Sequence, residues 1–231
     1  MSNKTAIVSG ATGNMGQAVV KKFLSENFTV IGTIAPGDHV KMDIANEKLE
    51  TAEVDLMSEE NAQEFVASVI KKHGSIDAAI LTVGGFAMGS IAQTTTKDIL
   101  KQYQLNFETA YNTARPIFQQ MLQQGDGRIF IIGSRPGLDM KFGKGMVAYS
   151  LAKSLIFRLA ELMNDEAKGK NVVTSVIVPS TIDTPQNRKS MPGVDAAKWV
   201  KPEAIADVLY FYCSDEAATL REPVIKIYNN A

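Results

Sequence analysis

The sequence is poor in the residue types that build covalent cross-links and metal centres. Its 231 residues include one cysteine and two histidines. The single cysteine, Cys213, cannot form an internal disulfide, so the fold must depend on its hydrophobic core, as expected for a protein of a reducing compartment. His39 and His73 form no ligand cluster with Cys213 or with paired carboxylates, and the sequence therefore predicts no metal site.

An excess of charge of either sign is also absent. The sequence holds 24 lysines and arginines against 25 aspartates and glutamates, which gives a net charge of −1. A nucleic-acid binder needs a basic excess that neutralises phosphates. The balance of charge therefore argues against a nucleic acid as the partner.

Long hydrophobic runs are missing as well. The longest uncharged segment, residues 78–96, is interrupted by Gly84, Gly85 and Gly89 and ends in polar residues, so it cannot form a membrane-spanning helix. The first residues lack the apolar stretch and the cleavage site of a signal peptide. We expect a cytoplasmic protein with no membrane partner.

What the sequence contains is enough apolar mass for one full core, since 45% of the residues are hydrophobic. No linker or repeat divides residues 1–231, and short β-branched runs alternate with helical patterns. The predicted strands are Thr5 to Ser9, Thr29 to Ile34, Ala52 to Val54, Ile76 to Thr82, Arg128 to Ile132, Val172 to Val178 and Val224 to Tyr228. The predicted helices are Met15 to Glu26, Glu59 to His73, Thr96 to Gln124, Tyr149 to Ala167 and Pro202 to Cys213. This alternation predicts a single α/β domain, a Rossmann-type doubly wound parallel sheet of about seven strands.

Three segments carry more specific expectations. Pro116 inside the segment 96–124 removes a helix hydrogen bond, which predicts a kink or two consecutive helices there. Residues 35–50 lack helical periodicity and are expected to form a loop with at most one helical turn. Residues 183–199 follow a strand end and contain two prolines, which is the position of a substrate lid in an open α/β sheet.

A glycine-rich turn follows the first predicted strand. Gly10, Gly13 and Gly16 permit a tight turn, a close approach of backbone amides to a pyrophosphate, and packing of the next helix on the strand. Asn14 and Met15 lie at the start of that helix, where its dipole faces the phosphates. The sequence therefore predicts a dinucleotide site formed by these five residues.

The end of the second strand bears on which dinucleotide binds. Many NAD-selective sites carry a carboxylate there that accepts hydrogen bonds from the ribose hydroxyls, whereas this chain has Ile34. His39 and Lys41 in the next loop would add positive charge beside a 2′-phosphate. NADP is therefore slightly favoured over NAD.

Asp55, after the third strand, is a candidate for contact with the adenine, and capping of the next helix is the rival explanation.

Tyr149 and Lys153 lie four residues apart and therefore share one face of a helix. The preceding strand ends at Ile132 and leads through Ser134 into a glycine-rich loop at the carboxyl edge of the sheet, where ligands bind in open α/β folds. A cation near a tyrosine lowers its pKa by roughly 1 to 3 units. We therefore expect Lys153 to lower the pKa of Tyr149 and to make it a better proton donor.

The order of these motifs, with Asn106 and the segments Val83-Gly84-Gly85 and Pro179 to Thr184, resembles the short-chain dehydrogenase/reductase family over nearly the whole chain. The resemblance implies that Ser134 and Tyr149 hold the substrate oxygen, that Lys153 binds the nicotinamide ribose, and that Asn106 anchors a proton-relay water. It also implies further cofactor contacts. These are Val83, Gly84, Pro179, Ile182 and Thr184.

Within that family, residues 182–192 and the segment Val83 to Ala87 resemble the dihydropteridine reductases. The chain departs from that branch because Ile34 stands where those enzymes have an aspartate, and because it has both Ser134 and Asn106, which they lack. It departs from most of the wider family at Asn14, where a glycine is usual. Retaining the serine and the asparagine leaves a carbonyl substrate open beside a pterin-like heterocycle.

Together, the residues and the resemblance predict an NAD(P)H-dependent oxidoreductase that transfers hydride to a C=O or C=N group of a small molecule, with Tyr149 as general acid. Two alternatives remain open: a regulatory protein that senses NAD(P) without chemistry, and an isomerase or dehydratase that keeps its cofactor through the cycle. The resemblance further implies a homodimer or homotetramer built on the helices at 96–124 and 149–167.

Overall fold

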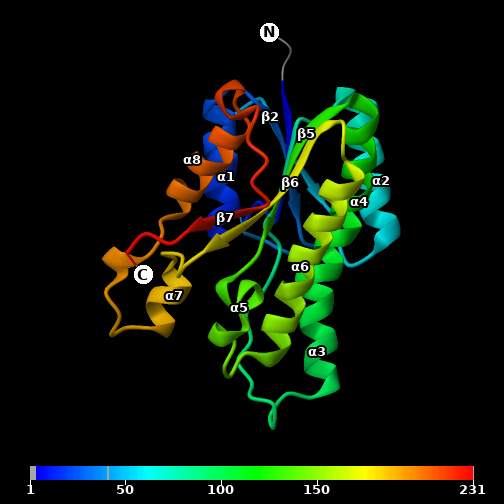
Figure 1. Cartoon of the computed structure of the whole chain (residues 1–231). Helices are drawn as coiled ribbons and strands as arrows, with labels where there is room; N and C mark the ends of the chain where they lie inside the picture. Colours follow the sequence, from blue (N-terminus) through cyan, green and yellow to red (C-terminus); the bar gives the residue numbers. More distant parts are fainter. Residues whose placement is uncertain (1–3, 41, 231) are drawn as a thin grey trace.

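The computed structural model describes residues 4–40 and 42–230. Within them, seven parallel strands form one sheet in the order β3-β2-β1-β4-β5-β6-β7 (Figure 1). The strands are β1 (Thr5–Ser9), β2 (Thr29–Ile34), β3 (Leu49–Glu53), β4 (Ala78–Leu81), β5 (Asp126–Ile132), β6 (Asn171–Pro179) and β7 (Val224–Ile227). The chain order reverses between β1 and β4, so a crevice opens at their carboxyl ends. The predicted doubly wound α/β fold is confirmed.

The inner strands are apolar because helices cover both of their faces. The side chains of β1 and β4 are buried along their whole lengths. β3 differs because it lies at the edge of the sheet, pairs only with β2, and alternates half-buried and exposed residues. An edge strand needs no apolar run, which explains why the sequence predicted this strand at 52–54 and missed its start at Leu49.

Five long helices form the two outer layers. They are α1 (Asn14–Ser25), α2 (Glu59–His73), α4 (Thr109–Gln124), α6 (Val147–Glu166) and α8 (Pro202–Tyr212). Figure 1 shows α1 and α8 on one face of the sheet and α2, α4 and α6 on the other. Each layer packs on its own apolar cluster. Phe23 and Val8 belong to the α1–α8 side, and Ile7 and Ile117 belong to the opposite side.

The segment predicted as 96–124 contains two helices, as one of the predicted alternatives required, but the interruption is not at Pro116. α3 (Thr96–Tyr103) leads into a π-helical turn at Gln104–Glu108, and α4 follows. Pro116 lies inside α4. A π turn inserts one extra residue into the helical path, and here it places Asn106, a buried residue, at the junction.

Residues 35–48 contain no helix among those described, as predicted, while Lys41 lies outside the described residues. The segment 183–199, predicted as a substrate lid, contains α7 (Pro185–Ser190) and a 3-10 turn at Ala196–Lys198, and its role as a lid stays a prediction. The short helix α5 (Arg135–Leu138) was also not predicted. Among the described helices, none has both the length and the apolar character that crossing a membrane requires.

Candidate active site

The glycine loop after β1 is held in place by backbone contacts. Gly10 has a φ of 64°, and its carbonyl oxygen accepts a hydrogen bond from the Gly13 N–H at 3.1 Å. A Cβ atom added at Gly16 would lie 2.2 Å from that same oxygen, so only glycine fits there. The Ala11 N–H donates to the Thr33 carbonyl at 3.0 Å, which ties the loop to β2.

The start of α1 has the features of a phosphate site. Its N-cap is Gly13, and no side chain caps the first turn. Asn14 is exposed and Met15 is half-buried. N–H groups at a helix start that no side chain accepts from, together with the helix dipole, suit an anionic group. The residues of this loop therefore fit the pyrophosphate of a dinucleotide.

A carboxylate that the sequence reasoning overlooked lies beside this loop. Asp38 follows β2 in a turn with Gly37 at a φ of 74°, and its Oδ2 accepts a hydrogen bond from the Thr12 hydroxyl at 2.6 Å. Its Oδ1 accepts from the Val40 N–H at 2.9 Å. The hydrogen bond from Thr12, followed by that from Val40, lowers the pKa of Asp38. The Pro-Gly-Asp sequence of the turn was the available signal, but it does not show which way the side chain points.

Asp55 does not cap α2, contrary to the rival explanation. Ser58 is the N-cap, and its hydroxyl accepts from the Asn61 N–H at 3.3 Å. The Asp55 Oδ1 instead accepts from the Met57 N–H at 3.0 Å within the turn before the helix. A contact of Asp55 with adenine stays a prediction.

Ser134, Tyr149 and Lys153 come together at the carboxyl end of β5. Tyr149 and Lys153 lie on the first turns of α6, and Ser134 is the N-cap of α5 with its Oγ accepting from the Gly137 N–H at 3.1 Å. The Ser134 side chain lies close enough to Tyr149 to influence the pKa of its hydroxyl. The Lys153 Nζ donates to the Ile132 carbonyl at 2.7 Å and is buried.

Burial shapes the acidity of both groups on α6. It lowers the pKa of Lys153 to about 8, because no carboxylate offsets the loss of water around the ammonium. Burial also raises the pKa of Tyr149, and Ser134 opposes this rise. The expectation of a lowered Tyr149 pKa was therefore wrong, because desolvation outweighs the opposing influence of Ser134.

Asn106 holds the segment after β4. Its Oδ1 accepts from the Gly85 N–H at 3.0 Å, and its Nδ2 donates to the Gly85 carbonyl at 3.0 Å and to the Gln102 Oε1 at 2.9 Å. A Cβ at Gly84 would lie 2.7 Å from the Asn106 Oδ1 and 3.1 Å from the Lys153 Nζ. Asn106 therefore lies next to Lys153 across Gly84, and its side-chain amide hydrogen-bonds the backbone of Gly85.

The remaining predicted cofactor residues lie after β4, at the end of β6 and in the segment that follows β6. The Val83 N–H points to the Ser9 Oγ at 3.4 Å, beside the glycine loop. Pro179 ends β6, and Ile182 pairs with Val200 in an isolated bridge. The Thr184 Oγ1 caps α7 by accepting from the Asn187 N–H at 3.2 Å. Their roles toward a cofactor stay predictions.

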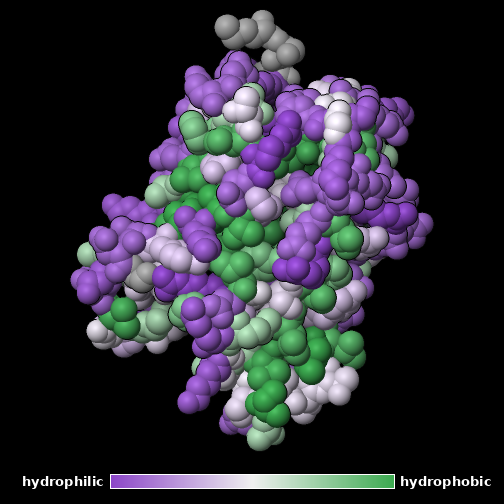
Figure 2. All heavy atoms as spheres, viewed as in Figure 1, coloured by the Kyte–Doolittle hydropathy of each residue, from purple (hydrophilic) through white to green (hydrophobic). Residues whose placement is uncertain are grey.

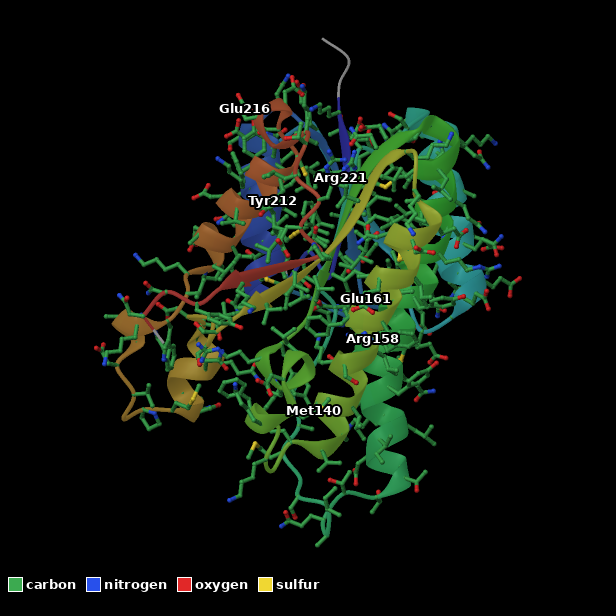
Figure 3. The ribbon with its side chains drawn as sticks, in the orientation of Figure 1. Met140, Arg158, Glu161, Tyr212, Glu216 and Arg221 are labelled. Carbon is green, nitrogen blue, oxygen red and sulfur yellow. The ribbon has the colours of Figure 1, made fainter. Side chains whose placement is uncertain are left out.

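Exposed apolar side chains lie on the segments that flank Tyr149, and these segments are called the mouth of the candidate site below. Phe86 is 61% exposed, and its ring lies edge-on to the Tyr149 ring at 5.2 Å between centroids. Met88, Met140 and Phe142 are also exposed. Figure 2 shows hydrophobic side chains gathered at this end of the molecule, and Figure 3 places Met140 beside the short helices that follow β5.

The structure was also searched for cavities and metal sites outside the group of Ser134, Tyr149 and Lys153. A cavity of about 820 Å³ is lined by residues of segment 183–199 and by Ala204, Ile227 and Asn229. Asp183 and Arg188, which form an ion pair, belong to its lining, whereas Ser134 and Tyr149 do not. Among residues 4–40 and 42–230, no three His, Cys, Asp or Glu side chains are grouped to hold a metal ion.

The chain is similar in sequence and in fold to known short-chain dehydrogenases and reductases. A family model described as short chain dehydrogenase matches residues 4–194. The cyclic-di-GMP-binding biofilm dispersal mediator protein of Escherichia coli K12 is 25% identical over 224 residues, covering 94% of this chain and 92% of the relative. The 3-oxoacyl-(acyl-carrier-protein) reductase FabG of Thermotoga maritima is 22% identical over 98% of this chain and 97% of its own. A crystal structure of a short chain dehydrogenase from Bacillus anthracis covers 98% of this chain and 95% of its own with a TM-score of 0.85 at 18% identity, which supports the fold.

Proposed function

The chain belongs to the short-chain dehydrogenase family, and we propose that it transfers hydride from a nicotinamide dinucleotide to a C=O or C=N group of a small molecule, with Tyr149 as the general acid. The observation that carries this proposal is the meeting of Ser134, Tyr149 and Lys153 at the carboxyl edge of the sheet. The reductase name of the Thermotoga maritima relative supports the same reaction class.

The glycine loop and the start of α1 would hold the pyrophosphate, and segment 179–184 would lie near the nicotinamide. A bound nicotinamide dinucleotide supplies the hydride, which the side chains of the protein cannot provide. The protein binds and orients both partners and handles the proton.

Reduction of a carbonyl adds a hydride to carbon and a proton to oxygen. The Ser134 and Tyr149 hydroxyls, which lie near each other, would hold the acceptor oxygen between them. Tyr149 gives its proton to that oxygen, and the ammonium of Lys153, one helical turn away, stabilises the phenolate left behind. Asn106 positions the Gly84–Gly85 segment against the lysine.

A pterin-like heterocycle is the second candidate for the acceptor. Residues 182–192, which resemble the dihydropteridine reductases, form α7 and the turn after it, and we propose that segment 183–199 acts as the substrate lid. A quinonoid dihydropterin presents a C=N group that needs the same hydride and proton. The exposed rings at the mouth are compatible with a planar acceptor.

The test is oxidation of NADH and NADPH by the purified protein with a panel of ketones and aldehydes and with a quinonoid dihydropterin. Tyr149→Phe is the matched control, because it keeps the ring beside Phe86 and removes only the hydroxyl. We expect turnover to fall by about 10² to 10⁴ in the variant while nucleotide affinity is retained, since positioned proton transfer is worth that factor.

Equal turnover by the two proteins would remove Tyr149 from the mechanism. Nucleotide binding with no turnover on any acceptor would favour the sensing alternative. Turnover without net nucleotide oxidation would indicate an isomerase or dehydratase.

We also propose that the protein forms a homodimer or homotetramer. Leu151, Leu155 and Leu162 on α6 are 45%, 37% and 69% exposed, and Leu100 on α3 is 55% exposed. These residues give the two neighbouring helices apolar outer surfaces that a second copy would cover. Sedimentation velocity checks this proposal, and a monomer at all concentrations would contradict it.

A further inference from the structure

Five large apolar side chains are exposed at the mouth of the candidate site. Between 46% and 80% of each is accessible to solvent, and the five are Phe86, Met88, Ile91, Met140 and Phe142. We call them the apolar tip. Figure 1 shows the loop before α3 projecting at this end of the molecule, and Figure 2 shows hydrophobic side chains there. Exposed apolar side chains that gather in this way mark a site of interaction with another molecule.

The two loops that carry the apolar tip are joined to each other. The Gly89 N–H donates to the Gly145 carbonyl at 2.7 Å, and the Val147 N–H donates to the Gly89 carbonyl at 3.0 Å. A Cβ atom at Gly145 would lie 3.7 Å from the Met88 Cε, so the side chain of the first loop lies against the second. The exposed side chains are therefore held by one connected piece of backbone.

Basic residues accompany the apolar tip. Segments 86–101 and 135–146 hold five lysines and arginines against two aspartates, whereas the whole chain has one more acidic than basic residue. Both aspartates already bind groups of the protein itself. Asp98 belongs to the capping box of α3, and Asp139 pairs with Lys141 at 2.7 Å. This end of the molecule therefore carries a positive charge that the chain as a whole does not have.

We propose that the apolar tip docks this protein on a lipid surface that carries negative charge. Apolar side chains accompanied by basic residues bind at the interface of a bilayer, where the apolar groups enter the acyl boundary and the cations meet anionic headgroups. An interface with a folded protein requires a surface of complementary shape. Lipid molecules instead rearrange around a projecting loop, so they fit the form of the apolar tip.

Docking of this kind needs no membrane-spanning helix. The sequence predicted no membrane partner because glycines interrupt residues 78–96, its longest uncharged segment, yet that segment supplies three of the five residues of the apolar tip. The ring of Phe86 lies beside that of Tyr149, so docking would turn the mouth of the candidate site toward the lipid. The proposal goes beyond the proposed function, and docking does not depend on turnover.

The experiment is flotation of the full chain with vesicles of equal parts phosphatidylcholine and phosphatidylserine, and with vesicles of phosphatidylcholine alone. We expect binding to the charged vesicles to be about tenfold or more tighter, because each basic residue near an anionic surface contributes roughly a fivefold gain. Raising the salt concentration should reduce this preference, because it screens the charges.

Ile91→Ser removes the most exposed side chain of the apolar tip and should weaken binding to the charged vesicles about tenfold. Leu220→Ser is the matched control, because Leu220 is also exposed but precedes β7, at the opposite edge of the sheet. It should leave binding unchanged. Lys144→Gln should weaken binding about fivefold. Lys71→Gln, at an exposed position of α2, should have no effect.

Absence of flotation, equal binding to the two kinds of vesicle, or equal losses in Ile91→Ser and Leu220→Ser would overturn the proposal and leave the proposed reductase intact. Sedimentation velocity without vesicles provides a further check. A smaller assembly in Ile91→Ser than in the natural protein would show that a second copy covers the apolar tip, which would also overturn lipid docking. Tyr149→Phe should float as the natural protein does, so a failure of the proposed reductase would leave docking intact.

Discussion

On the β1–β2 side of the sheet's carboxyl edge, the site is made of backbone, whereas on the side of α5 and the loop after β4 it is made of exposed side chains. Around Gly16 a single added carbon atom would meet the Gly10 carbonyl at 2.2 Å. At the other side, Phe86 and Met88 are 61% and 69% exposed. The backbone of the first side tolerates no added side-chain atom at Gly16. The exposed side chains of the second side can be replaced without a clash, so different acceptors could be accommodated there.

This difference separates the two tasks of the proposed enzyme. A dinucleotide keeps the same pyrophosphate in every cycle, so rigid backbone contacts suit it. A substrate pocket is specified by the side chains around its mouth, which can change without disturbing the sheet. We therefore expect substitutions on the glycine side to affect folding and nucleotide affinity, and substitutions at the mouth to affect acceptor kinetics alone.

The largest effect is expected for Gly16→Ala compared with Gly193→Ala in segment 183–199. The new methyl group at position 16 would overlap the Gly10 carbonyl, while no atom lies within 4 Å of a Cβ at position 193. Overpacking of this kind costs about 3 kcal/mol of unfolding free energy or more, which lowers the Tm by roughly 6 to 12 °C for a chain of this length. Thermal unfolding and nucleotide titration measure both consequences.

Gly193→Ala should change the unfolding free energy by no more than about 0.5 kcal/mol, as open surface positions do. If the two variants had equal Tm values, the glycine side would not be the rigid one. The contrast between the two sides of the edge would then have no basis.

The same contrast explains which elements and site residues could be predicted from the sequence. The bounds of β1, β2 and α2 were predicted to the residue, because buried strands and a capped amphipathic helix leave strong local patterns. The glycine loop was found for a related reason, since its shape admits few residue types. Ser134, Tyr149 and Lys153 were found because strand order brings the ends of β5 and the start of α6 together.

What escaped the sequence depends on contacts between distant segments. The direction of Asp38 is set by Thr12, and the π turn is accompanied by the pairing of Asn106 with Gly85. The raised pKa of Tyr149 follows from burial that no spacing encodes. Each of these requires knowing how two loops approach each other, which local periodicity does not show.

An intermediate effect is expected when the pH is raised. It should be large for kcat/KM, which depends on Lys153, and small for nucleotide affinity, which depends mainly on the glycine loop. The Lys153 ammonium is present below its pKa of about 8 and is lost as the pH rises through that value. Without that charge the Tyr149 phenolate is unsupported, so kcat/KM for reduction should be level below pH 8 and fall about tenfold per pH unit above it. Nucleotide affinity should change much less than kcat/KM from pH 7 to 9, because the backbone contacts that would hold the pyrophosphate do not titrate and only the ribose contact of Lys153 does.

Lys153→Met supplies the control for this profile. It should reduce activity and leave a rate that no longer falls between pH 8 and 9, since the titrating group has been removed. A fall of the same size in the variant would assign the pH dependence to another group.

The smallest effect is expected at Phe86, and it tests whether the mouth reads the acceptor. Phe86 lies edge-on beside Tyr149, and a ring pair between its exposed ring and a planar acceptor would be worth about 0.5 to 1.5 kcal/mol beyond the buried area. Phe86→Leu keeps an apolar side chain but removes the ring, so kcat/KM for a planar conjugated acceptor should fall roughly 2- to 12-fold. The nucleotide affinity should not change, and the Tm should fall by no more than about 6 °C, because only the ring pair with Tyr149 is lost from a side chain that is 61% exposed. Ile91→Ala, in the same loop and 80% exposed, should leave all three quantities unchanged. Equal losses in the two variants would mean that the loop acts through its apolar surface as a whole, and that no single ring on it selects the acceptor.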